Sequence, residues 1–185
     1  MDKIFQLVQE YREKTISGKS IELVPLKECF LEDVVRLRNQ KDSKYFLSQQ
    51  HDLTMEMQRK WYAEYLSRNN DLDWIVCNKQ GDVVGTISIY EIEQEKCNRG
   101  RTIIDENRKT ERPYAFETFI LVTKFAFDVL GVNKIINANK ADNEVMNSIS
   151  HTIGYDVLRE EEIRGVKHYY YELNRETFRS SRWNR

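Results

Sequence analysis

The chain of 185 residues is 40% hydrophobic and 32% charged, an ordinary composition for one globular domain with a single core. Its 8 Phe, 10 Tyr and 3 Trp exclude a disordered chain. The 29 basic and 30 acidic residues leave a net charge of −1, which gives no electrostatic case for binding nucleic acid or a membrane surface.

No apolar run approaches the roughly 20 residues that a membrane span needs, and the first residues lack a signal-peptide cleavage site. The cysteines at 29, 77 and 97 are odd in number and far apart, so they fit neither a disulfide framework nor a zinc site. We therefore expect a cytoplasmic protein whose cysteines are reduced thiols.

Apolar side chains recur at helical spacing in residues 2–14, which predicts an amphipathic helix in front of the domain. Residues 39–53 form a long polar stretch, and loops of that length are often functional. Thr54 is a plausible N-cap for the helix that follows. In chain order we expect helices at 2–14, 29–38, 54–66, 113–130 and 142–152, and strands at 21–26, 73–78, 82–90, 99–105, 134–139, 155–163 and 167–173.

This order predicts an α/β (α+β) domain with a mixed, mainly antiparallel sheet of about seven strands flanked by helices. The helix at 113–130 is apolar nearly all round, so we expect it to lie across the core of the sheet, and Gly131 fits its C-cap. The chain divides into a helical extension at 1–20, the domain at 21–174, and a basic, peripheral tail at 175–185.

The strand, loop and helix of residues 101–118 form the most informative segment. A helix N-terminus has unpaired N–H groups and a partial positive charge, so it binds phosphate readily. Pro113 suits the first helical turn, and Arg108, Lys109 and Arg112 add positive charge before it. The segment is therefore either a phosphate site or a solvated loop that opens a core helix.

Other polar residues are also candidates for contact with a ligand or for proton transfer. Asn143 is either a simple N-cap or an amide that reaches a ligand, and Ser150 is either a weak proton donor or an ordinary helical serine. His51, in the long polar stretch, is a candidate for substrate contact. A carboxylate near a strand end could assist the deprotonation of an amine, and the candidates are Glu91, Glu93 and Asp105.

Several segments, in this order and spacing, resemble the GNAT superfamily of N-acetyltransferases over residues 21–173. They are Pro113-Tyr114-Ala115, residues 125–134 (FAFDVLGVNK), Asn143 to Met146, Ile153-Gly154-Tyr155, and Leu158-Arg159-Glu160 with Gly165 and Tyr169. These resemble the ribosomal-protein N-acetyltransferase branch, whereas Leu37-Arg38-Asn39 is similar to the acceptor-side helix of amino-sugar N-acetyltransferases.

The resemblance implies that acetyl-CoA is the acyl donor and that no metal takes part. The residues that it assigns to the donor are Ile103, Ile104, Asp105, Lys109, Thr110, Glu111, Arg112, Pro113, Tyr114, Ala115, Asn143 and Met146. The sequence departs from the family at Thr110, where a basic or amide residue is usual, and at Pro113, where a glycine is usual. Ser150 stands where the family often has a tyrosine that protonates the CoA thiolate.

The implied reaction is direct attack of a primary amine on the thioester, with Glu91, Asp105 and Ser150 as catalytic candidates. Our first choice of acceptor is a nucleotide-linked amino sugar or other small amine, contacted by Arg38, Asn39 and His51. A protein N-terminus is the second choice. A CoA-binding or partner-binding module without catalysis is a third, and the helix at 2–14 suggests either a homodimer contact or packing on its own domain.

Overall fold

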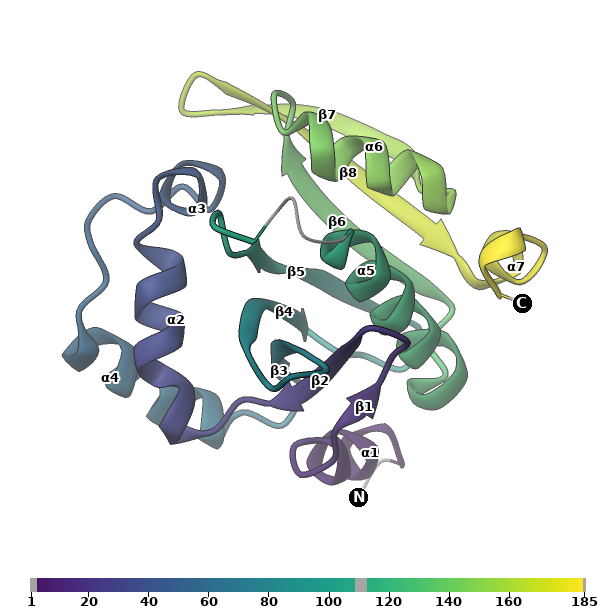
Figure 1. The fold of residues 1–185 in the computed structure, drawn as a ribbon. Helices are drawn as coiled ribbons and strands as arrows, with labels where there is room; N and C mark the ends of the chain where they lie inside the picture. Colours follow the sequence, from purple (N-terminus) through teal and green to yellow (C-terminus); the bar gives the residue numbers. More distant parts are fainter. Residues whose placement is uncertain (1–2, 109–112, 185) are drawn as a thin grey trace.

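The computed structural model describes residues 3–108 and 113–184, and these form an eight-stranded sheet in the order β1-β2-β3-β4-β5-β6-β8-β7 (Figure 1). The strands are β1 (Ile16–Ser17), β2 (Ile21–Pro25), β3 (Leu72–Asn78), β4 (Val83–Tyr90), β5 (Lys96–Ile104), β6 (Lys134–Lys140), β7 (Asp156–Ile163) and β8 (Val166–Asn174). All neighbouring pairs are antiparallel except β5 and β6, which are parallel. The α/β class with a mainly antiparallel sheet is thus confirmed.

Helices cover both faces of this sheet. The helices are α1 (Lys3–Tyr11), α2 (Leu31–Arg38), α3 (Lys41–Phe46), α4 (Met55–Ser67), α5 (Tyr114–Lys124), α6 (Glu144–Ile153) and α7 (Arg175–Arg179). A short 3-10 turn (Glu28–Phe30) precedes α2, a π-helical segment (Phe125–Leu130) continues α5, and another 3-10 turn (Arg182–Asn184) follows α7. The larger apolar core lies between the sheet and α1, α5 and α6, and a smaller one lies under α2 and α4.

Strand β3 lies inside the sheet, between β2 and β4, and its seven residues are all buried. Its side chains alternate between the two layers, since Trp74 and Val76 join the larger core whereas Ile75 and Cys77 join the smaller one. A strand that is covered on both faces has no face turned to water, which explains why β3 is mostly apolar along its length.

Local sequence signals locate several element ends correctly. The Thr54 hydroxyl accepts a hydrogen bond from the Met57 backbone N–H at 3.2 Å, which confirms the predicted cap of α4. Gly131 ends the long helical stretch with a φ of 81°, a left-handed conformation that glycine adopts without steric cost.

Two regions differ from the expectation. The stretch 39–53 is not an open loop, because α3 lies within it. This helix has six residues and only Ser43 is buried, so its sequence lacks the periodic apolar face by which a helix is predicted. The tail is not peripheral, because α7 inserts Phe178 into the larger core, where it is 1% exposed.

The N-terminal helix packs on its own domain. Ile4 and Val8 are buried in the larger core, and the Tyr11 ring meets the Phe125 ring edge-on, with 4.7 Å between centroids. Packing within the domain, one of the two interpretations of residues 2–14, is therefore confirmed.

Within the described residues, no helix is both long enough and apolar enough to cross a membrane. The three cysteines are free thiols, and burial raises the pKa of Cys77 to about 11 and that of Cys97 to about 12.

Candidate active site

A cleft opens where β5 and β6 separate. The two strands pair at Lys96–Asn98 with Lys134–Ile136, and then both continue for several residues without pairing to each other within the described chain. The cleft at this point has a volume of about 590 Å³ and is lined by the end of β5, by the residues after β6 and by the starts of α5 and α6; it is called here the strand cleft. Because the described residues place no strand along this part of the β5 edge, its backbone groups are available to an extended ligand.

Two helices begin at the strand cleft. Pro113, Tyr114 and Ala115 at the start of α5, and Asn143 and Met146 at the start of α6, all line it. Pro113 is the N-cap of α5 and has no polar side chain to cap the helix, whereas the Asn143 side-chain oxygen accepts a hydrogen bond from Met146 N–H at 3.3 Å. Both N-termini direct a partial positive charge toward the cleft, which suits a phosphate-bearing ligand.

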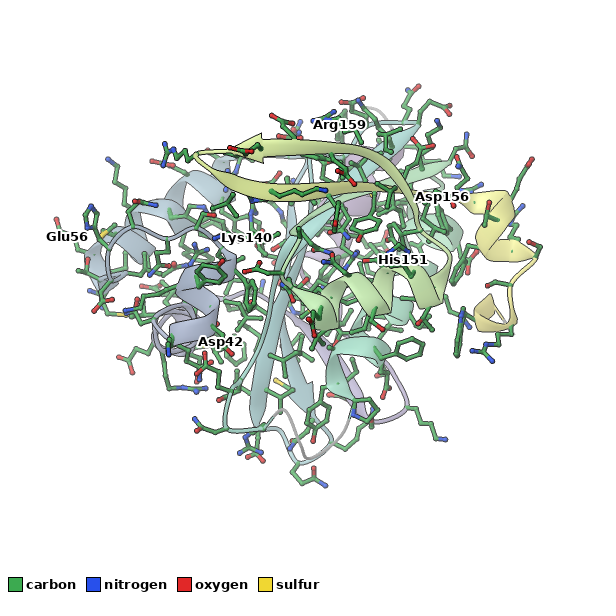
Figure 2. The ribbon with its side chains drawn as sticks, turned by 90° about the horizontal axis from the view of Figure 1, so that it is seen from above. Asp42, Glu56, Lys140, His151, Asp156 and Arg159 are labelled. Carbon is green, nitrogen blue, oxygen red and sulfur yellow. The ribbon has the colours of Figure 1, made fainter. Side chains whose placement is uncertain are left out.

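Helix α3 closes one end of the strand cleft. The Lys140 ammonium, at the end of β6, donates a hydrogen bond to the Tyr45 carbonyl at 2.6 Å, so the end of β6 is tied to α3 (Figure 2). On the other side, the Asp42 backbone N–H donates to a carboxylate oxygen of Glu106 just after β5, at 2.8 Å. This short helix thus bridges the ends of the two separated strands.

A second cavity of about 640 Å³ lies on the other side of β5, under α2 and α4, and is called here the polar cavity. Its floor is made by side chains of β3, β4 and β5, and its walls include Arg38 of α2 and Trp61 of α4. The two cavities share Leu47 and Ile103 as lining residues. The two cavities therefore adjoin at this shared wall.

An irregularity in β5 shapes the shared wall. The β4–β5 register shifts between Thr86 and Ser88, and Arg101 adopts a φ of 51° there, which is uncommon for a non-glycine residue. Beside it, a Cβ added at Gly85 would lie 2.1 Å from the Ile103 carbonyl oxygen, so only glycine fits at this position. The close approach of β4 determines where the Ile103 backbone lies.

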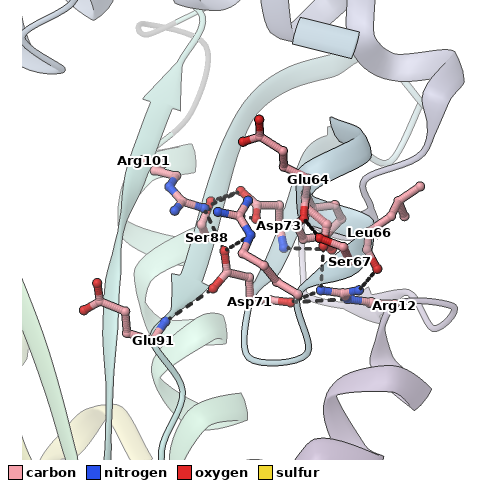
Figure 3. A network of polar contacts seen from close by, with 11 residues as sticks. Arg12, Glu64, Leu66, Ser67, Asp71, Asp73, Ser88, Glu91 and Arg101 are labelled. Atoms are coloured by element: carbon pink, nitrogen blue, oxygen red, sulfur yellow. Dashed lines mark hydrogen bonds and ion pairs between the residues drawn. The ribbon is translucent and has the colours of Figure 1, made fainter. Parts of the chain in front are cut away.

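A network of charged and polar side chains forms the floor of the polar cavity (Figure 3). The Asp73 carboxylate accepts hydrogen bonds from the Ser88 hydroxyl and from the Arg101 guanidinium, the latter at 3.3 and 3.4 Å. Arg101 also lies 3.7 Å from an Asp71 oxygen. Burial raises the pKa of Asp73, and the contacts with Arg101 and Ser88 oppose that rise.

Arg38 and Asn39, two residues expected to contact a substrate, have different positions. Arg38 lines the polar cavity, and its Nε donates a hydrogen bond to the Gln49 side-chain oxygen at 3.3 Å. Asn39 lies outside both cavities; its side chain accepts from Leu53 N–H at 2.7 Å and donates to the Leu53 carbonyl at 2.9 Å. Asn39 thus holds the end of the 39–53 segment, and exposed His51 lines neither cavity.

The three catalytic candidates also lie outside both cavities. Glu91 is exposed and accepts a hydrogen bond from the Asn98 side chain. Asp105 is 3% exposed, and its carboxylate is engaged by Arg36, Gln40 and Asn107. Ser150 is fully buried, where its hydroxyl donates to the Met146 carbonyl at 2.9 Å and accepts from the Asn137 side chain at 3.1 Å.

The residues assigned to the donor divide into two groups. Those that line the strand cleft are Ile103, Ile104, Pro113, Tyr114, Ala115, Asn143 and Met146. Asp105 does not line it, and Lys109, Thr110, Glu111 and Arg112 lie outside the described residues.

The polar floor was missed by reasoning from the sequence. Asp73 and Ser88 lie within strands that read as ordinary sheet segments, and Arg101 belongs to a third strand. A charged residue inside an apolar strand, such as Asp73 beside Trp74 and Ile75, is the signal that could have found it, because buried charges are rare unless paired.

A family model for the acetyltransferase (GNAT) domain matches residues 20–156. No curated protein matches the sequence significantly. The fold resembles that of spermidine N-acetyltransferase from Vibrio cholerae, solved in complex with CoA and spermine, with a TM-score of 0.79, 14% identity, and 87% of this chain and 99% of that one covered.

Two other solved structures are similar. Apo FdhC, a nucleotide-linked sugar GNAT, has a TM-score of 0.77 at 18% identity, with 90% of this chain and 93% of that one covered. A GCN5-related N-acetyltransferase from Brucella melitensis has a TM-score of 0.73 at 17% identity, with 90% and 80% covered. At these identities the structural likeness shows the fold, whereas the family model spans most of the chain. The chain therefore belongs to the GNAT acetyltransferases, a family of acyltransferases.

Proposed function

We propose that this protein transfers an acetyl group from acetyl-CoA to the primary amine of a small molecule, with a nucleotide-linked amino sugar as our first choice. The observation that supports this most directly is the pair of cavities that share Leu47 and Ile103. Two substrates bound on the two sides of β5 would meet at this wall, which gives the proximity that a direct transfer needs.

The strand cleft suits the acyl donor. Acetyl-CoA supplies a thioester-activated acetyl group, and its phosphates suit the N-termini of α5 and α6. Thr102 lines the cleft, and its hydroxyl is buried without a hydrogen-bond partner among the described residues. An unsatisfied buried group together with the unpaired edge of β5 is what an amide-containing chain would complete.

The polar cavity suits the acceptor. The amine nitrogen would form the new C–N bond as the C–S bond breaks, and the amine would lose one proton. The carboxylates that line this cavity are Glu64 and Asp73, so the proposal places any proton acceptor there rather than at Glu91 or Asp105. Because Ser150 lies in neither cavity, the proposal gives it no part in proton transfer.

The first test is isothermal titration of the purified protein with acetyl-CoA and with free CoA. We expect micromolar binding at a 1:1 stoichiometry. An Ala115→Asp variant should lose this affinity, because a carboxylate in the first turn of α5 is compatible with the helix but repels phosphate. The matched control is Thr177→Asp in the first turn of α7, outside both cavities, which should bind as the unchanged protein does.

A CoA-release assay then separates the acceptor classes. The acceptors are a uridine-diphosphate amino sugar, spermidine and a peptide with a free N-terminus. Release with the peptide and not with the amino sugar would replace our first choice by a protein N-terminus. Binding of acetyl-CoA without release for any of the amines would favour the module without catalysis, and no binding at all would contradict the proposal.

A further inference from the structure

Arg38 forms no ion pair with the described part of the chain. It is the last residue of α2, it is half-buried, and it lines the polar cavity. Its hydrogen bond to Gln49 has a neutral acceptor, and no carboxylate among the described residues lies within ion-pair distance of its guanidinium. Burial lowers the pKa of Arg38 and the nearby positive charge of Arg101 lowers it further, whereas the negative charge of Asp73 opposes this lowering only in part.

The other arginines around this cavity are paired. Arg101 contacts Asp73 and Asp71, and Arg68 contacts Asp71 at 3.1 Å. Removing a charge from water without a counter-ion is costly, and proteins usually offset that cost with a partner. Among the described residues Arg38 forms no ion pair, since Asp73 acts on it only at longer range and is engaged by Arg101, so a bound anion would supply the missing partner.

The orientation of Arg38 is set in advance. Gln49, which accepts its hydrogen bond, donates in turn to the Asn39 side-chain oxygen at 3.0 Å, and Asn39 is held by the Leu53 backbone. This chain of contacts fixes one edge of the guanidinium, and the terminal nitrogens have no hydrogen-bond partner among the described residues. A planar guanidinium held in this way suits the paired oxygens of a carboxylate or phosphate.

We propose that the polar cavity binds an acceptor bearing a carboxylate or phosphate, whose oxygens contact the Arg38 guanidinium. Lys60 and Arg101 line the same cavity and strengthen the attraction, whereas Asp73 is already engaged by Ser88 and Arg101. The buried Gln58 lines it too, and its amide nitrogen has no hydrogen-bond partner among the described residues. This inference rests on the proposed function, and it excludes polyamines as acceptors.

The physical reason for the exclusion is repulsion. A polyamine would bring several ammonium groups next to Arg38, Lys60 and Arg101, and the carboxylates that could receive them are fewer. Like charges brought close together repel each other, and this repulsion disfavours a polycation. The cavity thus differs in charge from one built for a polycation, although the fold resembles that of a spermidine N-acetyltransferase.

The test is titration of the protein, already saturated with CoA, with uridine diphosphate, glutarate and spermine. Saturation with CoA prevents the nucleotide from occupying the strand cleft. We expect at least one of the two anions to bind, and the one that binds identifies phosphate or carboxylate as the preferred group. An Arg38→Gln variant should bind that anion at least about tenfold more weakly, and Arg38→Lys should be intermediate because it retains the charge but not the planar donors.

The control variant is Arg59→Gln, an exposed position of α4 outside the cavity, which should leave anion affinity unchanged. Arg38→Gln should still bind acetyl-CoA as the unchanged protein does, which shows that it is folded. Tighter binding of spermine than of either anion, binding of neither anion at millimolar concentration, or equal anion affinity in Arg38→Gln would each overturn the inference. Failure of acetyl-CoA to bind would instead contradict the proposed function, and the anions would then be titrated without CoA.

Discussion

At the scale of single residues, the Asp105 carboxylate connects the end of β5 to α2 and to the segment before α3. It forms an ion pair with Arg36 at 2.5 Å and accepts from the Gln40 side chain at 2.9 Å and the Asn107 backbone N–H at 3.0 Å. Burial opposes its ionisation, but these hydrogen bonds outweigh burial and lower the pKa of Asp105. A carboxylate with a lowered pKa and occupied oxygens is a poor base, so its contacts favour a structural role.

An Asp105→Asn variant should therefore lose stability in a pH-dependent way. A carboxylate with a lowered folded-state pKa stabilises above its unfolded-state pKa, and that contribution disappears as the pH falls through the lowered folded-state pKa. We expect a loss of roughly 1–3 kcal/mol in the free energy of unfolding at pH 7, and this loss should decrease as the pH falls through the lowered folded-state pKa. Urea unfolding at pH 7 and at a series of acidic pH values measures it; a loss that does not change with pH would contradict the argument. Asp156→Asn, at an exposed position of β7, is the control.

Arg12 attaches the N-terminal helix to the domain. Its guanidinium donates to the carbonyl oxygens of Tyr65 at 3.2 Å, Leu66 at 3.4 Å and Asp71 at 3.1 Å, and lies 4.4 Å from the Tyr65 ring centroid (Figure 3). An Arg12→Met variant keeps the apolar stem but leaves these buried acceptors unpaired, so we expect a loss of roughly 1.5–3 kcal/mol in the free energy of unfolding. Urea unfolding measures the loss, and Arg179→Met at an exposed position should show almost none.

At the scale of elements, the close contact of β4 and β5 positions the wall between the two cavities. A Gly85→Ala variant would force the Ile103 carbonyl, 2.1 Å from the new Cβ, to move. We expect a loss of roughly 1–3 kcal/mol in the free energy of unfolding from this overpacking, together with weaker binding of acetyl-CoA.

The matched control is Gly81→Ala in the β3–β4 turn, where the new Cβ has no neighbour within 4 Å but the φ of 88° is unfavourable. That strain costs roughly 1–2 kcal/mol and should leave acetyl-CoA affinity unchanged. Thermal unfolding and isothermal titration of both variants separate the two effects. Equal acetyl-CoA affinity in Gly85→Ala and in the unchanged protein would show that the β4–β5 contact does not position the donor site.

At the scale of the whole molecule, the C-terminal helix is part of the domain. Phe178 packs against Phe127 with 5.6 Å between ring centroids, and the Trp183 indole N–H donates to the Thr152 carbonyl at 2.8 Å. A Phe178→Ala variant leaves a cavity in the larger core, so we expect a loss of roughly 3–5 kcal/mol in the free energy of unfolding. Urea unfolding checks this, with Thr177→Ala, an exposed neighbour, as control; a loss below that of the control would contradict the packing.

The sequence by itself determined most of the regular elements and the residues that line the strand cleft. Thr54 and Gly131 mark helix ends through contacts within a few residues, and the strands show their apolar pattern directly. The residues of the strand cleft could be predicted for the same reason, since the end of β5 and the start of α5 are close together in the chain. Signals of this kind depend on local geometry, which the order of residues specifies.

The tertiary structure alone decided which residues meet in the polar cavity. The polar cavity brings Arg38 of α2, Trp61 of α4 and Asp73 of β3 together, and no spacing in the sequence relates these positions. The candidates Glu91 and Asp105 look alike in the sequence, yet one is exposed and the other is buried among donors. Burial and pairing are set by neighbours in space, so they decide which charged side chains support the fold and which remain available to a substrate.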